Sequence, residues 1–113
     1  MSVKLERLEH TFVEQISQIL MLEIKDERIH FVTVTACSIT SDLSFAKVYV
    51  TILNDEERNS ILKLLNKASI FIERELSKRV EIRKMPNITF VYDESIEYAQ
   101  NIEKIIESTI ENE

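Results

Sequence analysis

The sequence predicts one α+β domain in which helices cover one face of a small β-sheet. The chain of 113 residues has the length of a single domain. Its hydrophobic residues (44%) and charged residues (30%) are in the proportions of a folded globular protein. The spacing of the apolar residues changes between a helical period and strand-like alternation, and this change predicts the order α-β-β-α-β-α.

The first predicted element is an amphipathic helix over about residues 3–24. Its apolar residues are spaced three and four apart, and they are Leu5, Leu8, Phe12, Ile16, Ile19 and Leu20. A polar connector follows at residues 25–28.

A predicted β-hairpin comes next, with strands over about residues 31–40 and 46–52. Strict alternation in the first strand places Val32 and Val34 on one face and Cys37 on the opposite face. Residues 41–44 contain Ser and Asp, which favour a turn.

Periodicity then predicts one long helix over about residues 56–79 and a third strand over residues 88–92 that follows Pro86. We expect the third strand to lie beside the first and parallel to it, which would place the first strand in the middle of the sheet. A last helix, capped by Asp93 or Ser95, is predicted from its apolar stripe. That stripe is Ile96, Ala99, Ile102, Ile106 and Ile110.

Charge is unevenly distributed along the chain. The last 21 residues carry seven acids against the single base Lys104, which accounts for the whole net charge of −6. Residues 74–84 carry a local charge of +3, contributed by Arg74, Lys78, Arg79, Arg83 and Lys84 against two glutamates. This basic stretch is either a solvated helix end or a surface that contacts phosphate groups.

Several kinds of site are excluded or disfavoured. The chain has no glycine, so no glycine-rich phosphate-binding loop can form. Cys37, His10 and His30 fall short of a zinc site, and we expect Cys37 to be a small buried apolar residue rather than a catalytic thiol. We therefore predict no catalytic residue, metal or cofactor. No signal peptide or membrane-spanning run is visible, which predicts a cytoplasmic protein.

Taken in order, four stretches resemble the bacterial ribosome-binding factor A family over residues 3 to about 106. They are Lys25–Ile29 with Phe31–Thr35, Ser41–Leu43 with Ala46–Val50, Ile72–Arg79, and Met85–Ile96. The resemblance implies a type II KH-like fold, α-β-β-α-α-β. In this family an interhelical kink, here at Ala68 and Ser69, replaces the glycine-containing loop of ordinary KH domains. It would divide the long helix into residues 56–67 and 70–79.

The resemblance also implies a function and a division of the chain. Residues 1–93 would form a KH-like RNA-binding domain, and residues 94–113 an acidic C-terminal helix. The family binds the free 30S ribosomal subunit and 16S rRNA, assists late maturation and 16S 5′-end processing without catalysing it, and matters most in the cold. We expect a monomer that binds neither a membrane nor a small-molecule substrate. The candidate RNA-binding residues are Arg74, Lys78, Arg79, Arg83, Lys84, Lys47 and Arg28. An alternative is a protein-interaction module that acts through the acidic C-terminal helix.

Overall fold

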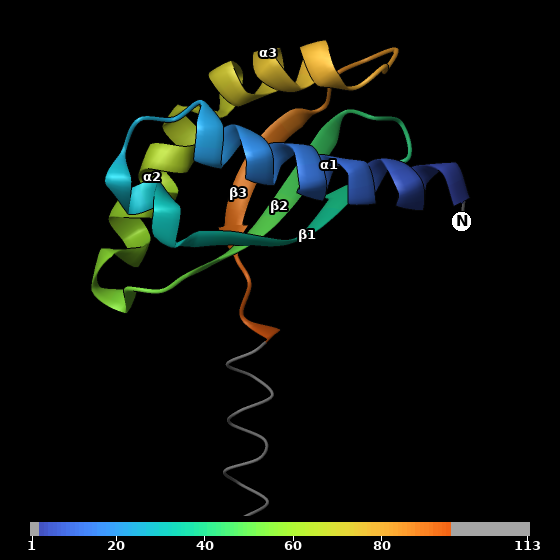
Figure 1. The fold of residues 1–113 in the computed structure, drawn as a ribbon. Helices are drawn as coiled ribbons and strands as arrows, with labels where there is room; N and C mark the ends of the chain where they lie inside the picture. The colour runs from blue at the N-terminus through green and yellow to red at the C-terminus, as the bar shows by residue number, and fades with distance from the viewer. Residues whose placement is uncertain (1–2, 96–113) are drawn as a thin grey trace, which may run out of the picture.

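Three helices cover one face of a three-stranded sheet (Figure 1). The computed structural model describes residues 3–95. Their elements are α1 (Val3–Leu22), the 3₁₀ helix η1 (Glu27–Phe31), β1 (Val32–Ile39), β2 (Phe45–Ile52), the 3₁₀ turn η2 (Asp55–Glu57), α2 (Arg58–Lys67), α3 (Ser69–Arg79) and β3 (Asn87–Tyr92). The predicted α+β class and the α-β-β-α-α-β order are confirmed. The predicted C-terminal helix lies outside the described residues.

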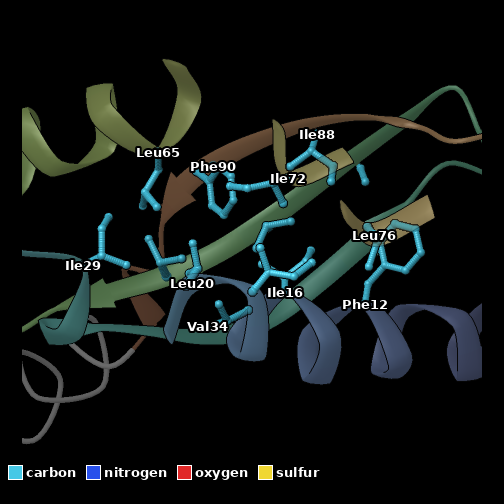
Figure 2. Close-up of a cluster of buried hydrophobic side chains, with 14 of the residues drawn as sticks. Phe12, Ile16, Leu20, Ile29, Val34, Leu65, Ile72, Leu76, Ile88 and Phe90 are labelled. Atoms are coloured by element: carbon cyan, nitrogen blue, oxygen red, sulfur yellow. The ribbon is translucent and has the colours of Figure 1, made fainter. Parts of the chain in front are cut away.

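The core forms between the helices and the inward face of the sheet. Figure 2 shows residues from α1, α2 and α3 pointing toward residues of β1 and β3. Phe12, Ile16 and Ile19 of α1 are completely buried, as the helical spacing of apolar residues predicts. In all three strands the inward-facing residues form this layer, and within residues 3–95 no helix covers the opposite face of the sheet.

The order of the strands differs from the prediction. β2, and not β1, lies in the middle, with β1 antiparallel to it on one side and β3 parallel to it on the other. The inward side chains of β2 are all buried, whereas β1 includes the half-buried Val32 and Cys37. The two helices between β2 and β3 form the crossover that a parallel pair needs, so β3 returns beside the strand that precedes it.

The predicted position of Cys37 is also wrong. The pairing register slips between Val34 and Ala36, because Thr35 is an extra residue that is not paired in the β1–β2 register. This β-bulge reverses the alternation after Thr35, so Cys37 lies on the inward face and packs against the core. Burial, and secondarily the charge of Glu9, raise the pKa of the Cys37 thiol to about 12.

The turn between β1 and β2 forms without glycine. Leu43 adopts a left-handed backbone conformation (φ 60°), which costs a non-glycine residue about 1–2 kcal/mol. Side-chain hydrogen bonds stabilise the turn: the hydroxyl of Thr40 accepts from the N–H groups of Ser44 and Phe45, and the carboxylate of Asp42 accepts from Ser44.

The break between α2 and α3 occurs at Ala68, as the resemblance implies. Ala68 has φ −88° and ψ 2°, outside the helical region, and its N–H bonds to the carbonyls of Leu64 and Leu65 at 3.0 and 3.1 Å. Periodicity alone missed this break because buried residues continue on both sides of it, at Leu65 and Ile72.

Ala68→Leu tests the packing at this kink. Ala68 is half-buried against the core, so a larger side chain should overpack the contact and lower the free energy of unfolding by about 1–3 kcal/mol. Urea denaturation measures the effect. Lys67→Leu, at the exposed neighbouring position, is the control and should change stability by less than about 0.5 kcal/mol. Equal midpoints for Ala68→Leu and the wild type would contradict the packed kink.

Side chains of the helices occupy both edges of the sheet. On β3, the side chain of Asn66 accepts from the Phe90 N–H at 2.7 Å and donates to the Phe90 carbonyl at 3.1 Å. Glu73 accepts from the Ile88 N–H at 3.3 Å. On β1, Glu9 accepts from the Ile39 N–H at 2.7 Å. These contacts fix α1, α2 and α3 to specific positions along the sheet.

Candidate RNA-binding surface

Two of the predicted RNA-binding residues lie on the outer side of α3. Ile72 and Leu76 bury the opposite side of this helix, so Arg74 and Lys78 project into solvent. The ammonium group of Lys78 lies 3.2 Å from the carboxylate of Glu75, but 64% of the Lys78 side chain remains exposed. An exposed pair of this kind holds its partners weakly, so Lys78 can exchange Glu75 for a phosphate.

Arg79, at the end of α3, has a structural contact. Its guanidinium donates to Gln18 at 3.3 Å and to Glu23 at 3.4 Å, and only a quarter of the side chain is exposed. The contact links the end of α3 to the C-terminal part of α1 and the residue that follows it. Arg79 is thus the least accessible of the basic residues predicted between 74 and 84.

Arg83 and Lys84 lie in the connector between α3 and β3, and both are exposed. The buried Val80 and Pro86 anchor the two ends of this connector to the core. The Lys84 ammonium donates to the Ser44 hydroxyl at 3.2 Å, and this contact places the connector beside the β1–β2 hairpin.

The remaining two predicted residues lie elsewhere. Lys47 is exposed on β2, on the sheet face opposite the helices. Arg28 lies in η1 and donates two hydrogen bonds to Asp26, at 2.9 and 3.1 Å. This pairing raises the pKa of Arg28 and lowers that of Asp26. The seven predicted residues therefore do not form one surface: five follow α3 and its connector, and Lys47 and Arg28 are separate.

Sequence analysis missed two lysines on α2. Lys63 and Lys67 are exposed, and they precede Arg74 and Lys78 at a spacing that would place all four on one side of a continuous helix. That spacing was the available signal. The break at Ala68 divides them into a pair on α2 and a pair on α3, and we call these four exposed residues together the helical basic surface. The exposed Ile70 and Phe71 lie between its two halves, at the start of α3.

An open depression of about 390 Å³ runs along the outer side of α2. Its lining residues are Asn59, Ser60, Leu62, Lys63 and Asn66. Asn66 also bonds to the edge of β3, so this depression connects the helical basic surface with the sheet edge. The Asn66 amide donates to Leu62 and Phe90 and the Ser60 hydroxyl donates to Glu57, so the donors here that can bind phosphate and sugar oxygens are those of Asn59 and Lys63.

Metal ligands, the thiol and the hydropathy of the helices can be checked in the part of the chain that the structure describes. Between residues 3 and 95, the histidine, cysteine and acidic side chains form no group of three that could hold a metal ion. The high pKa of Cys37 keeps its buried thiol protonated near neutral pH, so it is a poor nucleophile. None of the helices in this part of the chain has the length and apolar character needed to cross a membrane.

Comparisons with known proteins agree with this fold. The family profile described as "Ribosome-binding factor A" matches residues 4–106. A Staphylococcus epidermidis protein named "Ribosome-binding factor A" is 42% identical over 113 residues, covering 99% of this chain and 97% of that protein.

Two solved structures, both of Thermus thermophilus ribosome-binding factor A, are also similar. The crystal structure has a TM-score of 0.69 and 27% identity, covering 76% of this chain and 92% of that one. The other is a homology model fitted into a cryo-EM map of a 30S complex. It has a TM-score of 0.67 and 26% identity, and the match covers 80% of this chain and 96% of that one. Because the family profile spans nearly the whole sequence and a relative of the same name is 42% identical, this chain belongs to the ribosome-binding factor A family.

Proposed function

We propose that this protein is a non-catalytic assembly factor that binds the free 30S ribosomal subunit through 16S rRNA. It acts in the cytoplasm late in subunit maturation, and it assists processing of the 16S 5′ end without cleaving RNA itself. The observation that carries the proposal is the relationship to a protein of the same fold that has been fitted into a 30S complex. The exposed cations of the helical basic surface support it.

Phosphate contacts carry this binding. With no glycine in the chain, the kink at Ala68 cannot clamp a nucleotide backbone as the glycine-containing loop of ordinary KH domains does. The exposed cations that can make such contacts are instead Lys63, Lys67, Arg74 and Lys78 of the two helices, with Arg83 and Lys84 of the connector. Such contacts read the shape of folded RNA more than its sequence.

The protein assists maturation by differential affinity. A factor that binds immature rRNA more tightly than mature rRNA shifts the population toward the bound conformation and is released when the RNA folds further. This mechanism needs no bond to be made or broken by the protein. It also explains why a surface of exposed cations suffices without an enclosed site.

Co-sedimentation with ribosomal particles tests the proposal. We expect the full-length protein to sediment with free 30S subunits, and much less with 70S ribosomes or 50S subunits, in a sucrose gradient at low salt. Raising the salt should release it, because phosphate contacts weaken as counterions are added. Equal recovery with 30S and 50S subunits would contradict specific 30S binding.

The same gradient tests the alternative, a protein-interaction module that acts through the acidic C-terminal segment. A variant that ends at Ile96 lacks five of the seven acids of that segment. If this variant still sediments with 30S subunits, the segment is not the contact. If it folds but no longer binds, the alternative gains support and the helical basic surface does not.

A further inference from the structure

The sheet face opposite the helices carries two aromatic residues and a lysine on its central strand. Phe45, Lys47 and Tyr49 alternate outward along β2, each two residues from the next. The three helices that the structure describes, α1, α2 and α3, all pack on the other side, so none of them covers this face (Figure 1). Phe45 is 59% exposed, an unusual position for a phenylalanine on the middle strand of a sheet.

The residues that flank this row are short or polar. The pairing register places Asn87 beside Phe45, Ser38 and Thr89 on either side of Lys47, and Ala36 and Val91 on either side of Tyr49. Side chains of this size leave the aromatic rings accessible from solvent. The hydroxyl and amide groups can bond to sugars and bases, whereas a surface that docks an apolar helix would carry large aliphatic residues here.

Charge favours an anionic ligand at the hairpin end of this face. Lys47 is the only charged residue in the three strands. At the hairpin Lys84 contacts Ser44, the residue before Phe45, and its charge is balanced by the nearby carboxylate of Asp42, so the positive charge of this face is that of Lys47. The nearest acid along β3 is Asp93 at the opposite end of the strand, where its carboxylate accepts from Thr35 and Ser95.

We propose that this open face binds two or three unpaired nucleotides of RNA, with bases stacked on Phe45 and Tyr49 and a phosphate at Lys47. Aromatic side chains on a sheet stack unpaired bases in other RNA-binding domains, because every base presents a π-face. The site lies on the other side of the sheet from the helical basic surface. This inference takes from the proposed function only that the ligand is RNA. Such a site would let the protein hold a single strand beside folded rRNA.

The absence of tryptophan from the chain gives a direct measurement. Phe45→Trp introduces a single tryptophan on the open face while keeping an aromatic ring. In the full-length protein we expect its fluorescence to be quenched, saturably, by a single-stranded octamer of uridine, and much less by a duplex RNA of equal length. Stacking quenches the indole, and the bases of a duplex are already stacked on each other.

Substitutions then separate stacking from simple apolar contact. Phe45→Leu keeps an apolar side chain but removes the ring, and it should lower the affinity for the fluorescently labelled octamer by about 5- to 150-fold. Tyr49→Phe keeps the ring and should bind like the wild type. The matched control is Phe31→Leu, which removes the 52% exposed phenylalanine that ends η1 just before β1, at the other end of that strand from the hairpin, and should leave affinity unchanged.

Three results would overturn this inference. One is unchanged octamer affinity in Phe45→Leu with an unchanged urea midpoint. The second is a Phe45→Trp fluorescence that does not respond to the octamer. The third is a Phe45→Trp fluorescence that is blue-shifted before any RNA is added and that the octamer does not change. That result would mean that another part of the protein covers the face. Co-sedimentation with 30S subunits reports on the proposed function separately, because octamer binding is measured without ribosomes.

Discussion

Phe12→Ala is expected to lower the free energy of unfolding by about 3–5 kcal/mol. Phe12 is completely buried where α1 packs on the sheet, within the cluster shown in Figure 2. Removing the ring forfeits its burial and leaves a cavity that surrounding side chains fill only in part. Since small domains have total stabilities of about 5–15 kcal/mol, a large share of the molecules should unfold at moderate temperature.

The exposed phenylalanine of β2 provides a matched control for this experiment. Phe45→Ala removes the same atoms from a side chain that is 59% exposed, and the cost should be far smaller. Urea denaturation followed by circular dichroism gives both values. Similar midpoints for Phe12→Ala and Phe45→Ala would show that α1 does not pack on the sheet as described.

The second large effect concerns RNA affinity. Reversing Arg74 and Arg83 to glutamate should lower affinity for 30S subunits by on the order of tenfold or more, because charge-assisted contacts to phosphate are lost and replaced by repulsion. The plot of log affinity against log salt should become less steep, by about one for each lost phosphate contact. A salt titration of binding measures both quantities. Both residues are exposed, so the fold should persist.

A control with the same change in net charge separates the local effect from a general one. Arg7 lies in α1, and Lys25 lies in the connector after this helix. Both are exposed and lie outside the proposed surface. Arg7→Glu with Lys25→Glu should alter affinity only slightly. If both double variants lose affinity equally, long-range charge controls binding, and Arg74 and Arg83 are not direct contacts.

The helices and the hairpin could be predicted because their signals are local. The apolar spacing of α1 and the alternation of β2 are complete in the sequence, and the structure places the same residues in the core. The order of the strands depends on which strands pair with each other in the folded chain. The spacing of residues within one strand does not encode this pairing. The bulge at Thr35 likewise arises from pairing with β2, so alternation alone placed Cys37 on the wrong face.

Only part of the candidate surface could be predicted. The charge of residues 74–84 is visible in the sequence, and Lys63 and Lys67 could have been added from their helical spacing. The partners of Arg79 could not be predicted, because Gln18 and Glu23 are far from Arg79 in the sequence and meet it only in the folded domain. The role of these basic residues in RNA binding stays a prediction until the charge-reversal experiment is done.

The side chains at the sheet edges have a consequence for association between copies. A bare outer strand is a template on which other chains add strands, which leads to aggregation or to peptide capture by β-augmentation. Asn66 and Glu73 occupy backbone positions on β3, and Glu9 occupies one on β1. These side chains occupy backbone N–H groups that an added strand would need, at two positions on β3 and one on β1, and so hinder the sheets of two copies from joining there.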